Sequence, residues 1–566
     1  MANGAQEVLR VLEEAGVDCI IGIPGSSTVL IFSETTGRSF NVVLARQEHY
    51  AAVMADAYAR ASGRPAVLLG QGAFVCTNGS FGVTEAFASS SPMIVMADLT
   101  DFGSGARPGS QSVTGEYGAP DIPALMRAIT KFTAVATEPN EAVVATQLAI
   151  KHALAGCPGP SAVLMHNRAI VGTVDPAAYP HPAAGTGYLV RTRPIAAPAD
   201  VSRVLDLLRG AARPVIVAGK GVHNSGAHAE LRRFAESWEI PVVTSYTGKS
   251  AIEENHPLSL GMFGNIGRRS ANEQLAAADV VLVVGCKLAS SETLSESRDL
   301  INPARQKIVQ VDIEPRNCGW TFPVEVGLVG DARAVLEQLL AAGPPPVSQG
   351  LRLAEVRRRR AADPAEADPG LQADSVPVLP QRFVVVLEET IDPASNITLD
   401  AGYNRMWMSH FYHAQRPYSV FAPGGIVGMG WALPAALGVK LARPAEPVVA
   451  VMGDGGFMMS VQAIATAVES GLPFVGIVLN DSGLGMVRHH QQQWDKVVAS
   501  RFSLTDCAAI ARGFGIQGVR VNDSADLGDA IKQAQASNEP TILDVIIDET
   551  VIPDKYFART RRDSET

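Results

Sequence analysis

The chain has 566 residues, of which 47% are hydrophobic and 18% charged, and its formal net charge is -10. This composition is typical of a globular protein of several domains and excludes a disordered or fibrous chain. The negative charge disfavours a broad surface for nucleic acid or anionic membranes, and no apolar run reaches the length of a membrane span.

The N-terminal block, residues 1–170, alternates helical patterns with short apolar runs such as DCIIGIPG and PAVLLGQG. It opens with MANGAQEVLRVLEEAGVD, which is an amphipathic helix pattern and not a signal peptide. Six scattered cysteines without a CxxC pair indicate reduced thiols. We therefore expect a cytoplasmic protein.

Two further blocks, residues 195–345 and 380–550, repeat this alternation. Their near-continuous apolar runs, such as ADVVLVVGC and PFVGIVLND, are typical of strands in parallel sheets with helices on both faces. We predict an α/β protein with three doubly wound parallel-sheet domains. Between the blocks lie two linkers, 171–197 and 341–380, and residues 551–566 form a polar, basic tail.

In the third block, the apolar run VVAVM ends in Gly-Asp-Gly-Gly at positions 453–456. Ligands bind at the carboxyl ends of parallel strands, where glycines let a phosphate approach backbone N–H groups. A carboxylate beside a phosphate needs a divalent cation between them, and Mg²⁺ suits both. The next apolar run ends at Asn480-Asp481. The pattern indicates a metal–diphosphate clamp containing Asp454 and Asp481; the alternative is a glycine turn with a capping Asp.

The whole segment GDGGFMMSVQAIATAVESGLPFVGIVLNDSGLGMV resembles the cofactor motif of thiamine diphosphate enzymes, in the version found in acetohydroxyacid synthases. The resemblance implies that Asp454, Asp481 and the carbonyl of Gly483 hold Mg²⁺. Family members mostly carry Asn-Asn where this chain has Asn480-Asp481, so Asp481 adds a negative charge. The resemblance implies further cofactor contacts from Gly453, Gly455, Gly456, Leu484, Gly485 and Met486.

Two other segments resemble parts of the same family. VLARQEHYAAVMADAYARASGRPAV is similar to the segment around the glutamate that bonds N1′ of the cofactor's aminopyrimidine, which implies this role for Glu48. The alternative for an isolated Glu is a charge at a helix N-terminus. PGGIVGMGWALPAALG resembles the loop that bends the cofactor, with Met429 beneath it and the carbonyl of Val427 meeting the pyrimidine. By this resemblance, residues 1–170 bind the pyrimidine and 380–550 the diphosphate.

In this family the activating glutamate and the diphosphate loop come from two subunits. The resemblance therefore implies a homo-oligomer, a dimer or a tetramer, with active sites at the subunit interface. A non-catalytic relative that kept the fold is an alternative, which the joint presence of Glu48, Asp454 and Met429 disfavours.

The middle block, 195–345, is similar to the family's central domain, which binds FAD in acetohydroxyacid synthases. Here the flavin signature is interrupted by Cys-Lys-Leu at 286–288. Lys220, in the glycine turn AGKG, resembles instead the ADP-binding turn of oxalyl-CoA decarboxylases. We expect ADP or an empty Rossmann-like scaffold here, rather than FAD. The run Arg357–Arg360 is predicted to lie on a solvated linker helix; the alternative is a further phosphate contact.

Several positions at which this sequence differs from acetolactate-forming enzymes indicate the class of substrate. Tyr403-Asn404, in AGYNRMW, resembles the corresponding segment of oxalyl-CoA decarboxylases and 2-hydroxyacyl-CoA lyases, and Tyr117 falls where these relatives carry a tyrosine. We expect a carbon–carbon lyase that cleaves a 2-hydroxyacyl-CoA to formyl-CoA and a ketone or aldehyde. The alternative is an acetolactate synthase-like carboligase or 2-oxo acid decarboxylase, which the LGMV segment supports.

Further side chains are expected around the substrate. By their places in the matching segments, the substrate contacts are His49, Gln71 and Tyr117. GMVRHHQQQWDK offers His489 and His490 as proton carriers, while Gln493 can only orient a substrate by hydrogen bonds. A basic tail could close over the phosphates of CoA, or it could be a disordered end. The expected CoA contacts are Asn404, Lys555, Arg559, Arg561 and Arg562.

Overall fold

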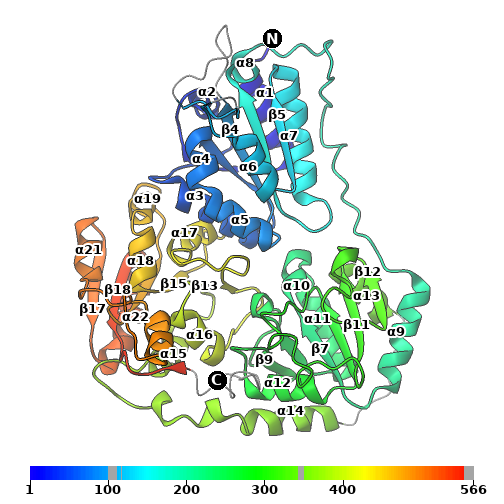
Figure 1. Cartoon of the computed structure of the whole chain (residues 1–566), viewed down its shortest axis with the longest axis vertical. Coiled ribbons are helices and arrows are strands. Elements are labelled where there is room, and N and C mark those ends of the chain that lie inside the picture. Colours follow the sequence, from blue (N-terminus) through cyan, green and yellow to red (C-terminus); the bar gives the residue numbers. More distant parts are fainter. Residues whose placement is uncertain (100–110, 116–117, 342–349, 554–566) are drawn as a thin grey trace.

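A computed structural model describes residues 1–99, 111–115, 118–341 and 350–553. Three six-stranded parallel sheets, with helices between successive strands, form three domains (Figure 1). The predicted α/β class with three doubly wound parallel sheets is confirmed. In Figure 1 the first domain lies at the top, the middle domain at the lower right and the third at the lower left.

The central strands of the first sheet are apolar and mostly buried, and β4 is buried along its whole length. Its strands, in spatial order, are β2 (Asn41–Leu44), β1 (Cys19–Ile23), β3 (Ala66–Gln71), β4 (Met93–Leu99), β6 (Pro160–His166) and β5 (Phe132–Ala136). Its helices are α1 (Gly4–Ala15), α2 (Thr28–Glu34), α3 (Glu48–Ser62), α4 (Gly72–Asn78), α5 (Ser80–Ala88), α6 (Ile122–Ile129), α7 (Pro139–Leu154) and α8 (Asn167–Val171).

The middle sheet repeats the pattern around the fully buried strands β7 and β10. In spatial order its strands are β12 (Val326–Val329), β11 (Lys307–Asp312), β10 (Val280–Val284), β7 (Pro214–Ala218), β8 (Val242–Thr244) and β9 (Ser259–Met262). Its helices are α9 (Pro198–Gly210), α10 (Lys220–Ser225), α11 (His228–Trp238), η1 (Tyr246–Gly248), α12 (Arg269–Ala277), η2 (Pro315–Asn317) and α13 (Ala332–Ala341). The connection to the third domain holds α14 (Leu351–Ala361), η3 (Pro364–Ala367) and η4 (Pro369–Leu371).

The third sheet brings the two predicted ligand-bearing strand ends side by side, because β15 pairs with β16. In spatial order its strands are β14 (Val420–Phe421), β13 (Asn396–Leu399), β15 (Val448–Gly453), β16 (Val475–Asn480), β18 (Thr541–Ile546) and β17 (Gln517–Val521). Its helices are α15 (Pro380–Thr390), α16 (Tyr403–Phe411), α17 (Ala432–Ala442), α18 (Asp454–Ser460), α19 (Ala463–Glu469), α20 (Gly485–Gln492), α21 (Cys507–Gly513) and α22 (Ser524–Ser537).

Helices α3 and α17 join the first and third domains through one hydrophobic core. Both are buried on all sides, from Tyr50 to Arg60 and from Ala432 to Lys440. Gly438 lies against the backbone of Met54, where a Cβ atom would collide. The two helices therefore pack as core elements, and the charged side chains that α3 buries, Asp56 and Arg60, pair with each other.

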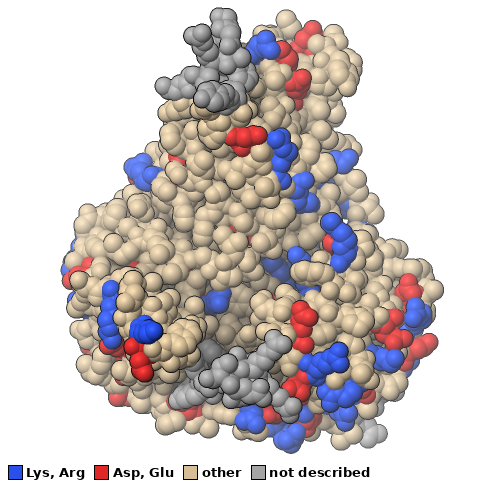
Figure 2. Space-filling model, viewed as in Figure 1, with Lys and Arg blue, Asp and Glu red and all other residues tan. Residues whose placement is uncertain are grey.

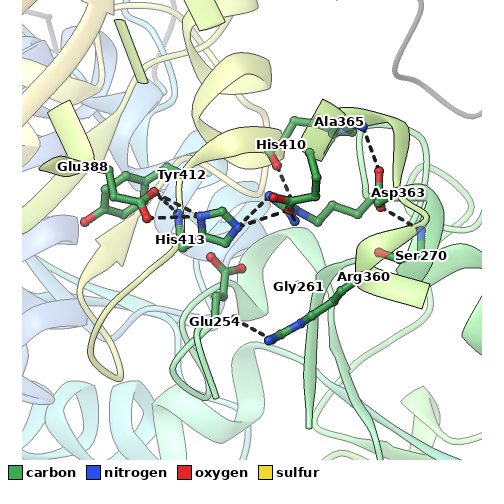
Figure 3. A network of polar contacts seen from close by, with 12 residues as sticks. Glu254, Gly261, Ser270, Arg360, Asp363, Ala365, Glu388, His410, Tyr412 and His413 are labelled. Atoms are coloured by element: carbon green, nitrogen blue, oxygen red, sulfur yellow. Dashed lines mark hydrogen bonds and ion pairs between the residues drawn. The ribbon is translucent and has the colours of Figure 1, made fainter. Parts of the chain in front are cut away.

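A polar network joins the middle and third domains (Figure 3). One ring nitrogen of His413 lies 3.2 Å from Glu388, and the other accepts from Arg268 at 2.8 Å. Arg360, on α14, donates to the carbonyls of Glu254 and His256, each at 2.8 Å, and to that of Ser259. The prediction of a solvated helix is thus wrong for Arg360, because backbone carbonyls of the middle domain supply its acceptors.

The surface carries no single block of one charge on the face drawn in Figure 2, where basic and acidic side chains are intermingled. Among the helices of the described ranges, none has both the length and the apolar character needed to cross a membrane.

Candidate active site

The junction of β15 and α18 holds an unpaired buried carboxylate, that of Asp454, the first residue of the helix. Asp454 is 1% exposed, and neither of its carboxylate oxygens has a hydrogen-bond partner among the described residues. Burial, and then the nearby charge of Asp481, raise the pKa of Asp454 to about 7, although nearby backbone N–H groups, those of Gly455, Asp454 and Gly483, act in the opposite direction. An isolated capping Asp would bond backbone N–H groups and keep a low pKa. These observations suit a carboxylate that binds a cation.

The glycines after Asp454 allow close packing around this loop. A Cβ atom at Gly455 would lie 3.0 Å from the Cε of Met429 and 3.2 Å from a methyl of Leu484. One at Gly456 would lie 3.0 Å from the carboxylate of Asp400. The structure thus brings together the glycine loop, Met429 and Leu484, as the sequence predicts for one cofactor site.

The neighbouring strand β16 ends in a second loop at the same sheet edge. Asn480 is buried and donates to Asp544 (2.8 Å) and to the carbonyl of Thr505 (3.0 Å), so its amide stabilises the fold. Asp481 is paired instead with Arg488, whose Nη2 donates to Oδ2 at 2.8 Å. Ser482 then takes a left-handed conformation (φ 55°) before Gly483.

Glu85, which sequence reasoning missed, holds the loop that contains Met429. Its buried carboxylate accepts four successive backbone N–H groups at 2.8–3.2 Å, those of residues 424–427. Burial would raise the pKa of Glu85, but Arg60, Ser89 and these N–H groups lower it to about 2. Val427 has φ 54°, an unfavourable conformation for a β-branched residue, and Glu85 stabilises it.

Asp400 holds the other side of the same loop. It follows β13, is fully buried, and accepts from the N–H groups of Gly430 and Ala432, both at 2.9 Å. Burial raises the pKa of Asp400 to about 6, although these N–H groups act in the opposite direction. Met429 therefore lies between two segments that are each fixed by a buried carboxylate. Each is a lone acid in an apolar segment of the sequence, which does not show which backbone N–H groups it binds.

In the first domain, the predicted catalytic residues gather at the N-terminus of α3 and the end of β3. Glu48 begins α3 and accepts from Asn78 at 3.2 Å. The ring of His49 stacks on Phe81 with centroids 4.4 Å apart, and burial lowers the pKa of this histidine. Gln71 donates to the side chain of Gln111. Phe81 in turn lies against Gly428, so this group adjoins the Met429 loop.

Comparison with known families identifies the class of protein. Residues 2–115 match the thiamine pyrophosphate enzyme N-terminal TPP binding domain, residues 201–339 the central domain, and residues 400–545 the C-terminal TPP binding domain. The chain belongs to the thiamine pyrophosphate enzymes. The cofactor of this family is thiamine pyrophosphate, which is also named thiamine diphosphate.

Several curated relatives match almost the whole chain. A probable acetolactate synthase large subunit of Methanocaldococcus jannaschii is 33% identical over 96% of this chain and 92% of its own length. The acetolactate synthase large subunit of Corynebacterium glutamicum is 30% identical, over 97% and 87%. Acetolactate synthase isozyme 3 large subunit of Escherichia coli is 29% identical, over 97% and 95%.

The donor set of this thiamine pyrophosphate enzyme fits a hard cation. Asp454 and Asp481 follow the paired strands β15 and β16, so two carboxylates lie at one sheet edge, and carboxylate oxygens are ligands that Mg²⁺ prefers. Within the described ranges, no group of three or more His, Cys, Asp or Glu side chains could hold a metal ion. A cation at this edge would thus need backbone and phosphate oxygens as well.

Some of the other predicted residues of the enzyme have structural partners, whereas others are exposed. Asn404 lies near Gly453 and donates to the carbonyl of Ala401 at 2.9 Å. His489 is buried, and its Nε2 lies 2.8 Å from the carbonyl of Glu549, while His490 and Gln493 are exposed. The ring of Tyr403 lies against that of His489 in a tilted arrangement, with centroids 5.3 Å apart. The remaining predicted contacts lie outside the described residues, namely Tyr117, Lys555, Arg559, Arg561 and Arg562.

Lys220 has an internal role that the sequence does not predict. Its ammonium group donates to the carbonyl of Ser89 and, at 3.1 Å, to the hydroxyl of Ser91, both in the first domain. Burial lowers the pKa of Lys220 to about 7. The flanking Gly219 and Gly221 pack against the backbone of Gly285. The glycines of this turn therefore allow the ends of β7 and β10 to pack closely. The structure thus uses the amine predicted for ADP as a bridge between domains.

Proposed function

We propose that this protein is a thiamine diphosphate-dependent carboligase that acts on a 2-oxo acid, in the manner of acetolactate synthases. The observation that carries the cofactor site is the buried, unpartnered carboxylate of Asp454 beside a glycine loop. The reaction class is supported by the names of relatives that are 29–33% identical over nearly the whole chain. These names favour the alternative activity considered from the sequence over the 2-hydroxyacyl-CoA lyase.

In this proposal, Asp454, Asp481 and the carbonyl of Gly483 hold Mg²⁺, and the glycine loop at 453–456 receives the diphosphate. The bound cofactor supplies an electron sink for the carbon that loses CO₂. Glu48 would hold a proton at the aminopyrimidine nitrogen N1′, and Met429 would pack against the cofactor. The proposal includes no nucleotide, because the amine of Lys220 is bound between domains.

We also propose that each active site is shared by two copies of the chain. On one side of Glu48, Arg46 binds Glu469; on the other, the Tyr50 hydroxyl lies 3.0 Å from that of Thr466. Both contacts are made to α19, whereas Asp454 lies at the other end of the helix pair α18–α19, where α18 begins (Figure 1). Exposed apolar side chains of β2, α4 and α18 flank these elements and suit a second copy: Val42, Leu44, Phe74, Met458 and Met459.

Mixed dimers test the shared site. Glu48→Gln and Asp454→Asn would each inactivate the homodimer. If a site takes Glu48 from one copy and Asp454 from the other, co-expression of both variants restores one intact site per mixed dimer, or about a quarter of wild-type activity. No recovery in a mixture shown to contain mixed dimers would place both residues in one chain and reject the shared site.

The substrate class is tested by supplying pyruvate and, separately, a 2-hydroxyacyl-CoA to the enzyme with thiamine diphosphate and Mg²⁺. We expect CO₂ and acetolactate from pyruvate and no formyl-CoA from the thioester. Formyl-CoA release without acetolactate formation would overturn the proposed reaction and favour the lyase.

A further inference from the structure

The loop proposed to bind the metal has two carboxylates, of Asp454 and Asp481, so it carries one negative charge more than a site with one Asp and one Asn. Two carboxylates and a diphosphate around one divalent cation place negative groups close together. Unless the extra charge is offset, Asp481 repels the diphosphate. A buried arginine beside Asp481 is the group that can offset it.

Arg488 comes from α20, one turn beyond the metal loop, and its side chain is 1% exposed. One guanidinium nitrogen donates to Oδ2 of Asp481 at 2.8 Å, and another to the backbone carbonyl of Asp481 at 3.2 Å. A Cβ atom at Gly483 would lie 2.9 Å from the same guanidinium. The arginine thus lies under the loop, and its burial argues against direct contact with a bound anion.

We propose that Arg488 is a positioning residue that makes Asp481 act as an asparagine-like ligand. This inference rests on the proposed function. The ion pair removes the extra charge and turns Oδ2 toward the protein, which leaves Oδ1 for the cation. Together, the two carboxylates and the Arg488 guanidinium carry a net charge of minus one, which is also the charge of a site with one Asp and one Asn.

The surroundings hold Asp481 in this orientation. Gly485 gives room for Oδ2, because a Cβ atom there would collide with it. The loop is also held by backbone bonds between Leu484 N and Ser500 O (2.9 Å) and between Phe502 N and Ser482 O (2.8 Å). The carboxylate therefore has little freedom to rotate away from Arg488.

Arg488 is not held by Asp481 alone. Its guanidinium lies 3.3 Å from Glu549, which also pairs with Arg501 at 3.1 Å. Glu549 can therefore partly compensate Arg488 when Asp481 is neutral. This arrangement predicts an asymmetric result: removal of the arginine alone harms cofactor binding more than removal of both charges.

A double-mutant cycle tests the inference through binding rather than activity. The affinity for thiamine diphosphate at saturating Mg²⁺ is measured by titration calorimetry for wild type, Arg488→Met, Asp481→Asn and the double variant. Arg488→Met is expected to weaken binding about tenfold, because it leaves an uncompensated carboxylate. Asp481→Asn and the double variant are expected within about threefold of wild type.

Two further variants keep the test interpretable. Arg501→Met, which removes the other partner of Glu549, is expected to leave the affinity unchanged. Arg488→Lys keeps the charge without the two-pronged contact and should lose less than Arg488→Met. If wild type binds the cofactor but the effects of Arg488→Met and Asp481→Asn are additive, this inference alone is overturned. A folded wild type that binds no thiamine diphosphate would overturn the proposed function and the inference with it.

Discussion

Asp454 shows how a residue that is proposed to bind a cation can lower the stability of the protein. Its carboxylate is buried without a partner, and its pKa is raised from 3.8 to about 7 by burial and then by Asp481. The folded chain therefore binds this proton more tightly than the unfolded chain. The resulting penalty on folding grows as the pH rises from about 3.8 to about 7 and is complete above that. A bound cation would remove it.

We therefore predict that Asp454→Asn stabilises the protein when cofactor and Mg²⁺ are absent. At pH 8 its melting temperature should exceed that of wild type by about 2 °C or more, since the buried charge is gone. The difference should shrink as the pH is lowered from 7 toward 4. Thiamine diphosphate with Mg²⁺ should raise the melting temperature of wild type only. Exposed Asp529→Asn is the control; a less stable Asp454→Asn at pH 8 would contradict the argument.

At the scale of elements, the glycine loop and the end of β16 could be predicted from sequence, because each directly follows an apolar run. Glu85 could not, since the N–H groups that it binds lie 339–342 residues further along the chain. Nor could Arg488, because its pairing with Asp481 depends on how α20 packs under the loop. Sequence patterns show where strands end, whereas they do not show which buried charge a distant loop will meet.

The loop from Gly424 to Ala432 is predicted to depend on Glu85. Glu85→Gln keeps the shape but removes the charge that pairs with Arg60 at 2.9 Å, and its amide nitrogen cannot accept from the loop. We expect a loss of about 3 kcal/mol in the free energy of unfolding, and weaker thiamine diphosphate binding because Val427 is no longer held. Urea denaturation and calorimetry measure the two effects. The exposed Glu389→Gln should change neither; unchanged stability of Glu85→Gln would refute the proposed support.

At the scale of the whole molecule, the three-block pattern predicts three parallel sheets but not how they meet. The packing of α3 on α17 joins the first and third domains into one core, and Arg360 and His413 join the middle domain to the third. These contacts fix Glu48 and Asp454 on rigid supports within one chain. In the proposed dimer, the exposed apolar side chains beside them form the surface on which a second copy completes the site.

Met459, on α18, tests this surface because its side chain is 52% exposed in the single chain. Burial of Met459 between two copies would make a charge there costly, so Met459→Asp should shift the protein toward monomers in analytical ultracentrifugation. Monomers hold half of each proposed site, and thiamine diphosphate binding should weaken in parallel. Trp320→Asp, at a 65% exposed side chain of the middle domain, should leave assembly unchanged. A Met459→Asp protein that assembles and binds the cofactor like wild type would exclude α18 from the interface.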